Sequence, residues 1–110
     1  MANLFYAVFD GNLTADATFK QISDEKGVIN FTLAHNFPTN KKDDEGKTIY
    51  EPQFYACTKW MNTGSEPTGL LENLKKGSRV TVEVQKIDIS TTTQEEKKYT
   101  NINFIVSNIV

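Results

Sequence analysis

Residues 28–36, VINFTLAHN, decide the fold class, because apolar and polar side chains alternate along them. Ile29 and Leu33 fall on one side of an extended chain, whereas Asn30 and Thr32 fall on the other. A period of two residues is typical of a strand with one face in a core and the other in solvent. The stretch therefore predicts a half-buried β-strand.

Similar patterns before and after this stretch predict further strands. They cover residues 3–13, 50–60, 80–89 and 101–107, and only a short extended piece at 19–22 lies between the first of these strands and residues 28–36. One helix is predicted at residues 66–76, with Ser65 as its N-cap, three leucines between positions 70 and 74 on its apolar side, and Gly77 after its end. The hydrophilic tracts at 40–47 and 90–98 lack an apolar pattern, so we expect both to be loops.

The first predicted strand is apolar on both faces. Leu4, Tyr6 and Val8 alternate with other apolar residues, and we expect the strand to continue through Gly11 with a bulge or kink. A core of this size can cover only one face of the strand. We therefore expect Leu4, Tyr6 and Val8 to form a contact between subunits.

The order of elements suggests an architecture. Three strands, one helix and two strands match the outline of an all-β, five-stranded OB-fold Greek-key barrel with a short helix between strands 3 and 4. A ubiquitin-like or SH3-like arrangement is the alternative at this point. The length of 110 residues predicts a single domain over residues 1–110.

Composition argues against several functional classes. A single Cys57 and a single His35 cannot supply a disulfide or a structural zinc site, and no cofactor motif is present, so we expect neither metal nor cofactor. Cys57 and His35 could act as a nucleophile and base, but Cys57 lies mid-strand like a buried side chain, and we expect no enzyme. The absence of a leader or membrane span predicts a cytoplasmic protein.

The aromatic residues of the third strand suggest another function. Phe54 and Trp60 share one face of residues 54–60, FYACTKW, where they either belong to the core or serve as platforms on which nucleic-acid bases stack. The net charge of −2 does not favour binding of a polyanion by the chain as a whole. Lysines in or beside the loops and strand ends can still supply local contacts to phosphates.

Four segments resemble bacterial-type single-stranded DNA-binding proteins, including those that phages encode. The segments are GNLTADATFK (11–20), VINFTLAHN (28–36), FYACTKW (54–60) and LLENLKKGSRVTVEVQ (70–85). The resemblance implies an OB-fold that binds single-stranded DNA without strong sequence preference, commonly as a homotetramer, in replication, recombination and repair. A dimer is the other oligomer that we consider.

The resemblance also implies roles for individual residues. Phe54, Trp60 and Phe37 fall at or near stacking positions of the family, whereas Ile89, Ser90 and Thr91 stand where another stacking aromatic is expected. The expected contacts to phosphates are Lys20, Lys41, Lys42, Lys59, Arg79 and Lys86.

The end of the sequence differs from the family pattern. Family members that recruit replication and recombination proteins carry a flexible acidic tail, whereas this sequence stops at Val110, directly after the last predicted strand. We expect either a truncated domain, which would be associated with the nucleoid, or a tail-less version from a phage or mobile element, in the host cytoplasm. The alternative function is an OB-fold adaptor that joins proteins of a replication or recombination complex and binds DNA weakly.

Overall fold

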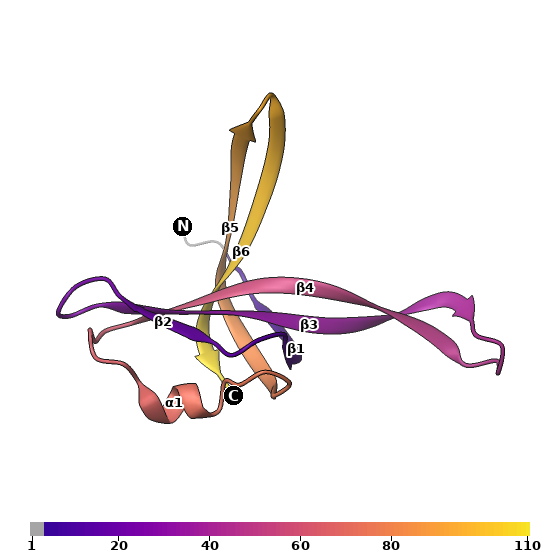
Figure 1. Ribbon diagram of the computed structural model, residues 1–110, viewed down its shortest axis with the longest axis horizontal. Coiled ribbons are helices and arrows are strands. Elements are labelled where there is room, and N and C mark those ends of the chain that lie inside the picture. The colour runs from indigo at the N-terminus through magenta and orange to yellow at the C-terminus, as the bar shows by residue number, and fades with distance from the viewer. Residues whose placement is uncertain (1–3) are drawn as a thin grey trace.

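The strands form one sheet that closes on itself in the computed structural model, which describes residues 4–110 (Figure 1). The elements are β1 (Ala7–Leu13), β2 (Thr18–Gln21), β3 (Gly27–Lys42), β4 (Thr48–Met61), α1 (Thr68–Glu72), β5 (Arg79–Gln94) and β6 (Lys97–Ile109). The strand order is β1-β5-β6-β4-β3-β2, and an additional pairing of β1 with β3 closes the barrel. β4 and β6 are parallel, and all other pairs are antiparallel.

This topology confirms the five-stranded OB-fold. β1 and β2 lie on one stretch of chain interrupted at residues 14–17, and together they act as the first strand of the barrel. α1 lies between β4 and β5, as expected. The ubiquitin-like and SH3-like alternatives are therefore excluded.

Gly11 allows β1 to reach β3. β1 continues through this residue, as predicted, and the following pairs are Asn12 with Ala34 and Leu13 with Leu33. A Cβ atom at Gly11 would lie only 2.7 Å from the carbonyl oxygen of Ala34. The absence of a side chain at this position lets the two backbones approach each other and close the barrel.

The core lies inside the barrel and at the end that α1 covers. Alternate residues of β3 and β5 point inward, as the sequence patterns predict, and Leu71 and Leu74 enter the same cluster from α1 and the turn after it. The most deeply buried side chains are Ile29, Leu33, Leu74, Val82 and Cys57.

The helix is shorter than predicted. Pro67, not Ser65, occupies the N-cap position, no side chain caps the helix, and Asn73 ends it. Gly69 lies inside the helix, and glycine lowers helix stability. Gly77 has a φ of +86°, but it belongs to the turn before β5, where its N–H donates to the carbonyl of Leu13.

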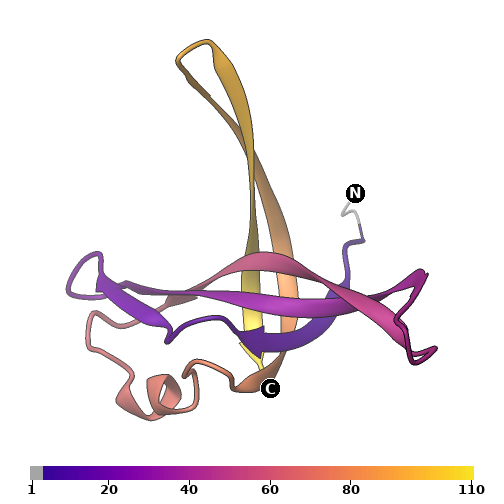
Figure 2. The same cartoon turned by 45° about the vertical axis from the view of Figure 1, so that its right-hand side comes forward.

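The predicted loops are mostly strand. β3 and β4 remain paired as far as Lys42 and Thr48, and β5 and β6 remain paired as far as Gln94 and Lys97. Two long hairpins therefore extend away from the barrel (Figures 1 and 2). Their polar residues are exposed on both faces, so they show no apolar alternation and the sequence pattern predicts loops.

The first strand is also shorter than predicted, since β1 begins at Ala7. Leu4 and Tyr6 precede it, and Asn3 lies outside the described residues. Ile102 alternates with polar residues of β6 in phase with the buried Val106, but it lies on the outer part of the β5–β6 hairpin and is half exposed. No helix in residues 4–110 has the length and apolar character needed to cross a membrane.

Candidate nucleic-acid interface

Phe54 and Trp60 lie on the outside of the barrel. Trp60 pairs with Val28, which in turn pairs with Lys20, and Phe54 pairs with Ala34. Paired residues point to the same side of a sheet, and this side is opposite to that of the buried Cys57. Phe54 is 62% exposed and Trp60 is 53% exposed, so neither side chain belongs to the core.

The two aromatic residues mark the ends of a wider surface, which we call the outer face. It consists of the side chains that point outward from β2, β3, β4 and β6, in the region that extends across the sheet from Lys20 on β2 to Asn103 on β6. One row of paired residues crosses the middle of this face and continues onto β5: Thr18, Asn30, Thr58, Ile105 and Lys86. The row joins a polar centre to a lysine at its far end.

Tyr99 is a further aromatic residue that the sequence patterns did not identify. It lies on β6, four positions before Asn103, so both side chains leave the same side of that strand. Tyr99 pairs with Thr92 and is about half exposed. The sequence signal was a single tyrosine beside a polar tract, and only the strand pairing places it on a continuation of the outer face.

Phe37 does not share the outer face. It lies two residues after His35 on the inward side of β3, and its ring centroid is 4.6 Å from that of His35. Of the three predicted stacking residues, the fold therefore brings Phe54 and Trp60 onto one face and directs Phe37 to the other.

The six predicted cations differ in how free they are. Lys59 donates to the carbonyl of Ser107 at 2.6 Å, and Arg79 contacts the carboxylate of Asp10 at 2.7 Å. Lys86 contacts Asp88 at 3.1 Å. Lys41 and Lys42 end β3 near the tip of the hairpin, where the Lys42 ammonium donates to Oγ1 of Thr48 at 2.7 Å. Lys20 lies on β2 on the outer face.

A second surface surrounds β1. β1 pairs with β5 from Ala7 to Asn12 but meets β3 only at Asn12 and Leu13, so part of its other edge has no partner strand within the described chain. Leu4, Tyr6 and Val8, the predicted contact residues, are all exposed there.

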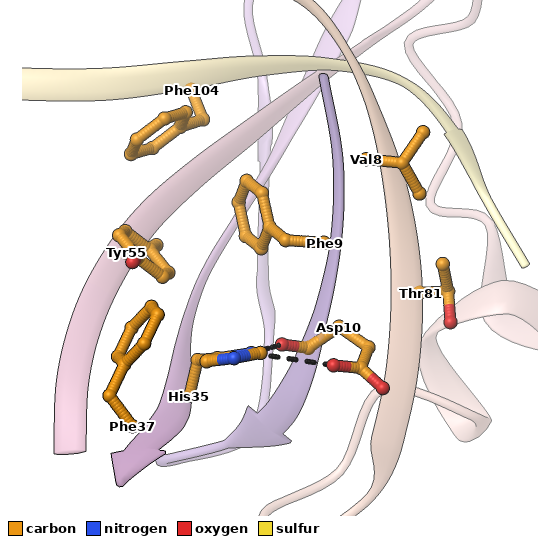
Figure 3. A pocket seen from close by; sticks show the side chains of 8 residues that line it. All are labelled: Val8, Phe9, Asp10, His35, Phe37, Tyr55, Thr81 and Phe104. Atoms are coloured by element: carbon orange, nitrogen blue, oxygen red, sulfur yellow. Dashed lines mark hydrogen bonds and ion pairs between the residues drawn. The ribbon is translucent and has the colours of Figure 1, made fainter. Parts of the chain in front are cut away.

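An apolar cleft of about 590 Å³ opens at the same edge of β1 (Figure 3). Phe9, Tyr55 and Phe104 form one aromatic cluster in it, with ring centroids between 4.7 and 5.3 Å apart. Tyr55 lies on the opposite side of β4 from Phe54, so this cleft is separate from the outer face.

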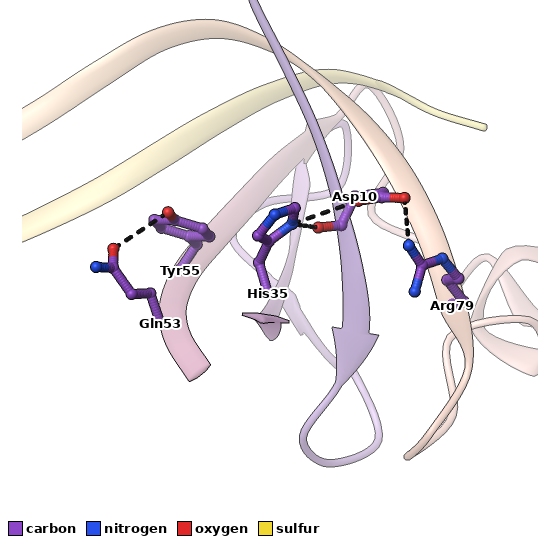
Figure 4. Close-up of polar contacts among 5 residues, drawn as sticks. All are labelled: Asp10, His35, Gln53, Tyr55 and Arg79. Atoms are coloured by element: carbon purple, nitrogen blue, oxygen red, sulfur yellow. Dashed lines mark hydrogen bonds and ion pairs between the residues drawn. The ribbon is translucent and has the colours of Figure 1, made fainter. Parts of the chain in front are cut away.

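His35 is held by a hydrogen bond, and Cys57 is buried in the core. The carbonyl of Asp10 accepts a hydrogen bond from the Nδ1 of His35 at 2.6 Å, and the carboxylate of Asp10 also contacts Arg79, so Asp10 links β1 to β3 and β5 (Figure 4). Burial raises the pKa of the Cys57 thiol to about 12. A thiol whose pKa is raised in this way is mainly protonated at neutral pH, whereas the thiolate is the nucleophilic form.

The fold and the outer face define a class of protein. An OB-fold barrel with exposed aromatic residues on an outer strand face is typical of barrels that bind single-stranded nucleic acid. Residues 5–110 match the model of the single-strand binding protein family, and the chain belongs to this family.

Solved structures show the same fold at low sequence identity. The small single-stranded DNA-binding protein of Streptomyces coelicolor matches with a TM-score of 0.70 and 18% identity, over 99% of this chain and 94% of that one. The Plasmodium falciparum SSB in complex with ssDNA matches with a TM-score of 0.73 and 16% identity, over 100% of this chain and 96% of that one. A deletion mutant of the single-stranded DNA binding protein of Thermus aquaticus matches with a TM-score of 0.68 and 17% identity, over 96% of this chain and 49% of that one.

Proposed function

We propose that this protein binds single-stranded DNA without sequence preference, by stacking bases on Phe54 and Trp60 and contacting phosphates with lysines. The observation that carries the proposal is the exposure of both rings on one face of an OB-fold barrel from the single-strand binding protein family. Every base has an aromatic face, so stacking requires no particular sequence. The structural likeness to a family member in complex with ssDNA supports the same function.

The net charge of −2 is compatible with this function. Stacking contributes about 1–3 kcal/mol per base, so two or three platforms account for much of the binding free energy. Several acidic residues lie away from the outer face, including Asp43, Asp44 and Glu45 in the β3–β4 turn. Lys20 and Lys86 lie on the rows of paired residues that also contain Trp60 and Thr58.

A titration of oligo-dT against the fluorescence of Trp60 tests the proposal, because this is the only tryptophan in the chain. We expect quenching at low salt, a complex that weakens as salt increases, and affinity that rises with oligonucleotide length until the binding face is filled. An unquenched Trp60 and no salt-sensitive complex would favour the alternative of a protein-binding adaptor.

Substitution of two lysines, one at a time, distinguishes a lysine that contacts a phosphate from a lysine with a structural role. We expect Lys20→Ala to reduce the slope of log K against log salt by about 0.7, the value for one contact to a single strand, because its side chain lies on the outer face. Lys59→Ala removes the same charge, but the Lys59 ammonium is bound to Ser107, so its slope should remain that of the unaltered protein. Equal slopes in both variants would argue against the role of Lys20.

We also propose that the chain forms a homodimer or homotetramer through β1. The unpaired edge of β1, the apolar cleft beside it and the exposed Leu4, Tyr6 and Val8 support this contact. A strand edge is a template for pairing with a second strand.

Sedimentation of a Tyr6→Asp variant tests this contact. We expect the unaltered protein to sediment as a dimer or tetramer, and the variant to shift toward the monomer at micromolar concentration, because a carboxylate would be buried at the contact. Tyr6 precedes β1 and is largely exposed, so the barrel itself should remain folded. A monomeric unaltered protein would refute the proposal.

Family membership supports a role in replication, recombination or repair in the cytoplasm, without an enzymatic activity of its own. We also propose that the protein contacts other proteins of replication or recombination.

A further inference from the structure

Thr58 is the only buried polar side chain in the described part of the chain, although it lies on the outer face between Phe54 and Trp60. It is 6% exposed. Its Oγ1 lies 2.8 Å from Oδ1 of Asn30 and 2.8 Å from Nδ2 of Asn103. The side chains of three strands thus meet midway between the two aromatic platforms.

The proton of Thr58 determines the direction of these hydrogen bonds. A hydroxyl donates once, and here it donates to Oδ1 of Asn30 while it accepts from Nδ2 of Asn103. Oδ1 of Asn103 also lies 3.1 Å from Oγ1 of Thr58. Because the single hydroxyl proton is directed to the nearer Oδ1 of Asn30, the Oδ1 of Asn103 keeps its capacity to accept, and the Nδ2 donors of Asn30 remain available for other partners. Asn30 is exposed and Asn103 is partly exposed, so both side chains are accessible from solvent.

Asn30 and Asn103 both line a groove of about 280 Å³. Thr32 and Ala56 lie between them on its wall, and residues 14–16 border it. Ala56 has a small side chain, which leaves space above β4. The groove therefore presents a hydrogen-bond donor and a hydrogen-bond acceptor beside the stacking platforms.

We propose that this groove binds the Watson–Crick edge of one unpaired base while other bases of the strand stack on Phe54 and Trp60. The proposal rests on the proposed function of single-stranded DNA binding. Each of the four bases carries a donor next to an acceptor on this edge, such as N3–H and O4 in thymine or the N6 amino group and N1 in adenine. The donor of Asn30 and the acceptor of Asn103 can pair with any of them by rotation of the base.

Such a groove recognises the single-stranded state and not a sequence. In a duplex the Watson–Crick edge is occupied by the opposite base, so only an unpaired base can enter. A phosphate is a poorer occupant, because Asp16, which borders the groove and accepts a hydrogen bond from the N–H of Lys76, places a negative charge close to it.

An oligonucleotide of N3-methylthymidine tests the proposal, because the methyl group blocks the Watson–Crick edge and leaves the stacking face and the phosphates intact. We expect the unaltered protein to bind it about 5- to 30-fold more weakly than oligo-dT of the same length, the effect of one or two lost hydrogen bonds. In Asn103→Leu, and separately in Thr58→Val, the two oligonucleotides should differ by much less. Trp60 quenching should persist in both variants and shows that they are folded.

Asn101→Leu is the matched control. Asn101 lies two residues before Asn103 on the same side of β6, donates to Oγ1 of Thr92 and does not line the groove. This variant should therefore retain the full difference between the two oligonucleotides. Equal binding of both oligonucleotides by the unaltered protein would overturn the proposal while leaving DNA binding intact. A reduced salt slope in Asn103→Leu would also overturn it in favour of a phosphate. Absence of any quenching by oligo-dT would instead refute the DNA-binding function itself.

Discussion

Replacement of Trp60 by alanine is expected to weaken the binding of oligo-dT by about 1–3 kcal/mol, and replacement of Phe54 by a similar amount. Each variant removes one aromatic face from the outer surface and leaves the lysines in place. The loss should therefore appear as a lower affinity at every salt concentration, with an unchanged slope against log salt. The double variant should lose about 2–6 kcal/mol if the two platforms act independently.

Anisotropy of a labelled oligonucleotide measures these losses, because Trp60→Ala removes the intrinsic fluorophore. Phe37→Ala is the control, since this exposed aromatic residue points to the opposite side of β3. We expect it to retain most of the affinity. A loss at Phe37 as large as that at Trp60 would mean that DNA passes around the edge of the barrel, and no loss at Phe54 or Trp60 would contradict stacking on the outer face.

The largest effect on stability is expected from Leu74→Ala, at about 2–5 kcal/mol. Leu74 is 1% exposed and packs in the barrel core from the turn after α1, while its carbonyl accepts a hydrogen bond from the N–H of Ala17. The substitution removes apolar contacts and leaves a cavity that the closed barrel cannot easily fill. Denaturant unfolding, followed by circular dichroism, measures the loss.

Leu70→Ala provides the comparison for Leu74. Leu70 lies inside α1 but is only partly buried, so its loss should be clearly smaller. Below its unfolding transition, Leu74→Ala should bind oligo-dT as the unaltered protein does, because Leu74 lies in the turn after α1 and the outer face is formed by strands β2, β3, β4 and β6. Equal destabilisation by the two substitutions would contradict the packing described for Leu74.

The fold was predictable where one side of a strand is buried. Residues such as Ile29 and Leu33 alternate with polar neighbours because the barrel interior accepts every second side chain. The hairpins beyond Asn36 and Ile89 were not predictable in this way. Their strands are held by backbone hydrogen bonds between polar residues, and an exposed strand leaves no apolar period in the sequence.

The candidate site was predictable in part. The side of β4 that carries Phe54 and Trp60 follows from the period of a strand, but that side could have faced the core or the solvent. Family resemblance favoured solvent, and their exposure confirms it. Tyr99 was missed because its position depends on a pairing between β5 and β6 that places it on a continuation of the same surface.

The sequence alone determined the all-β character of the fold, the inward residues of the barrel strands and the pair of aromatic residues on β4. These features depend on local periodicity, which adjacent residues encode. Only the tertiary structure decided which cations are free and which are bound within the barrel. It also decided that Asn30, Thr58 and Asn103 meet, because they lie on three strands that are far apart in the chain. Contacts of this kind depend on strand register and barrel closure, which no local pattern contains.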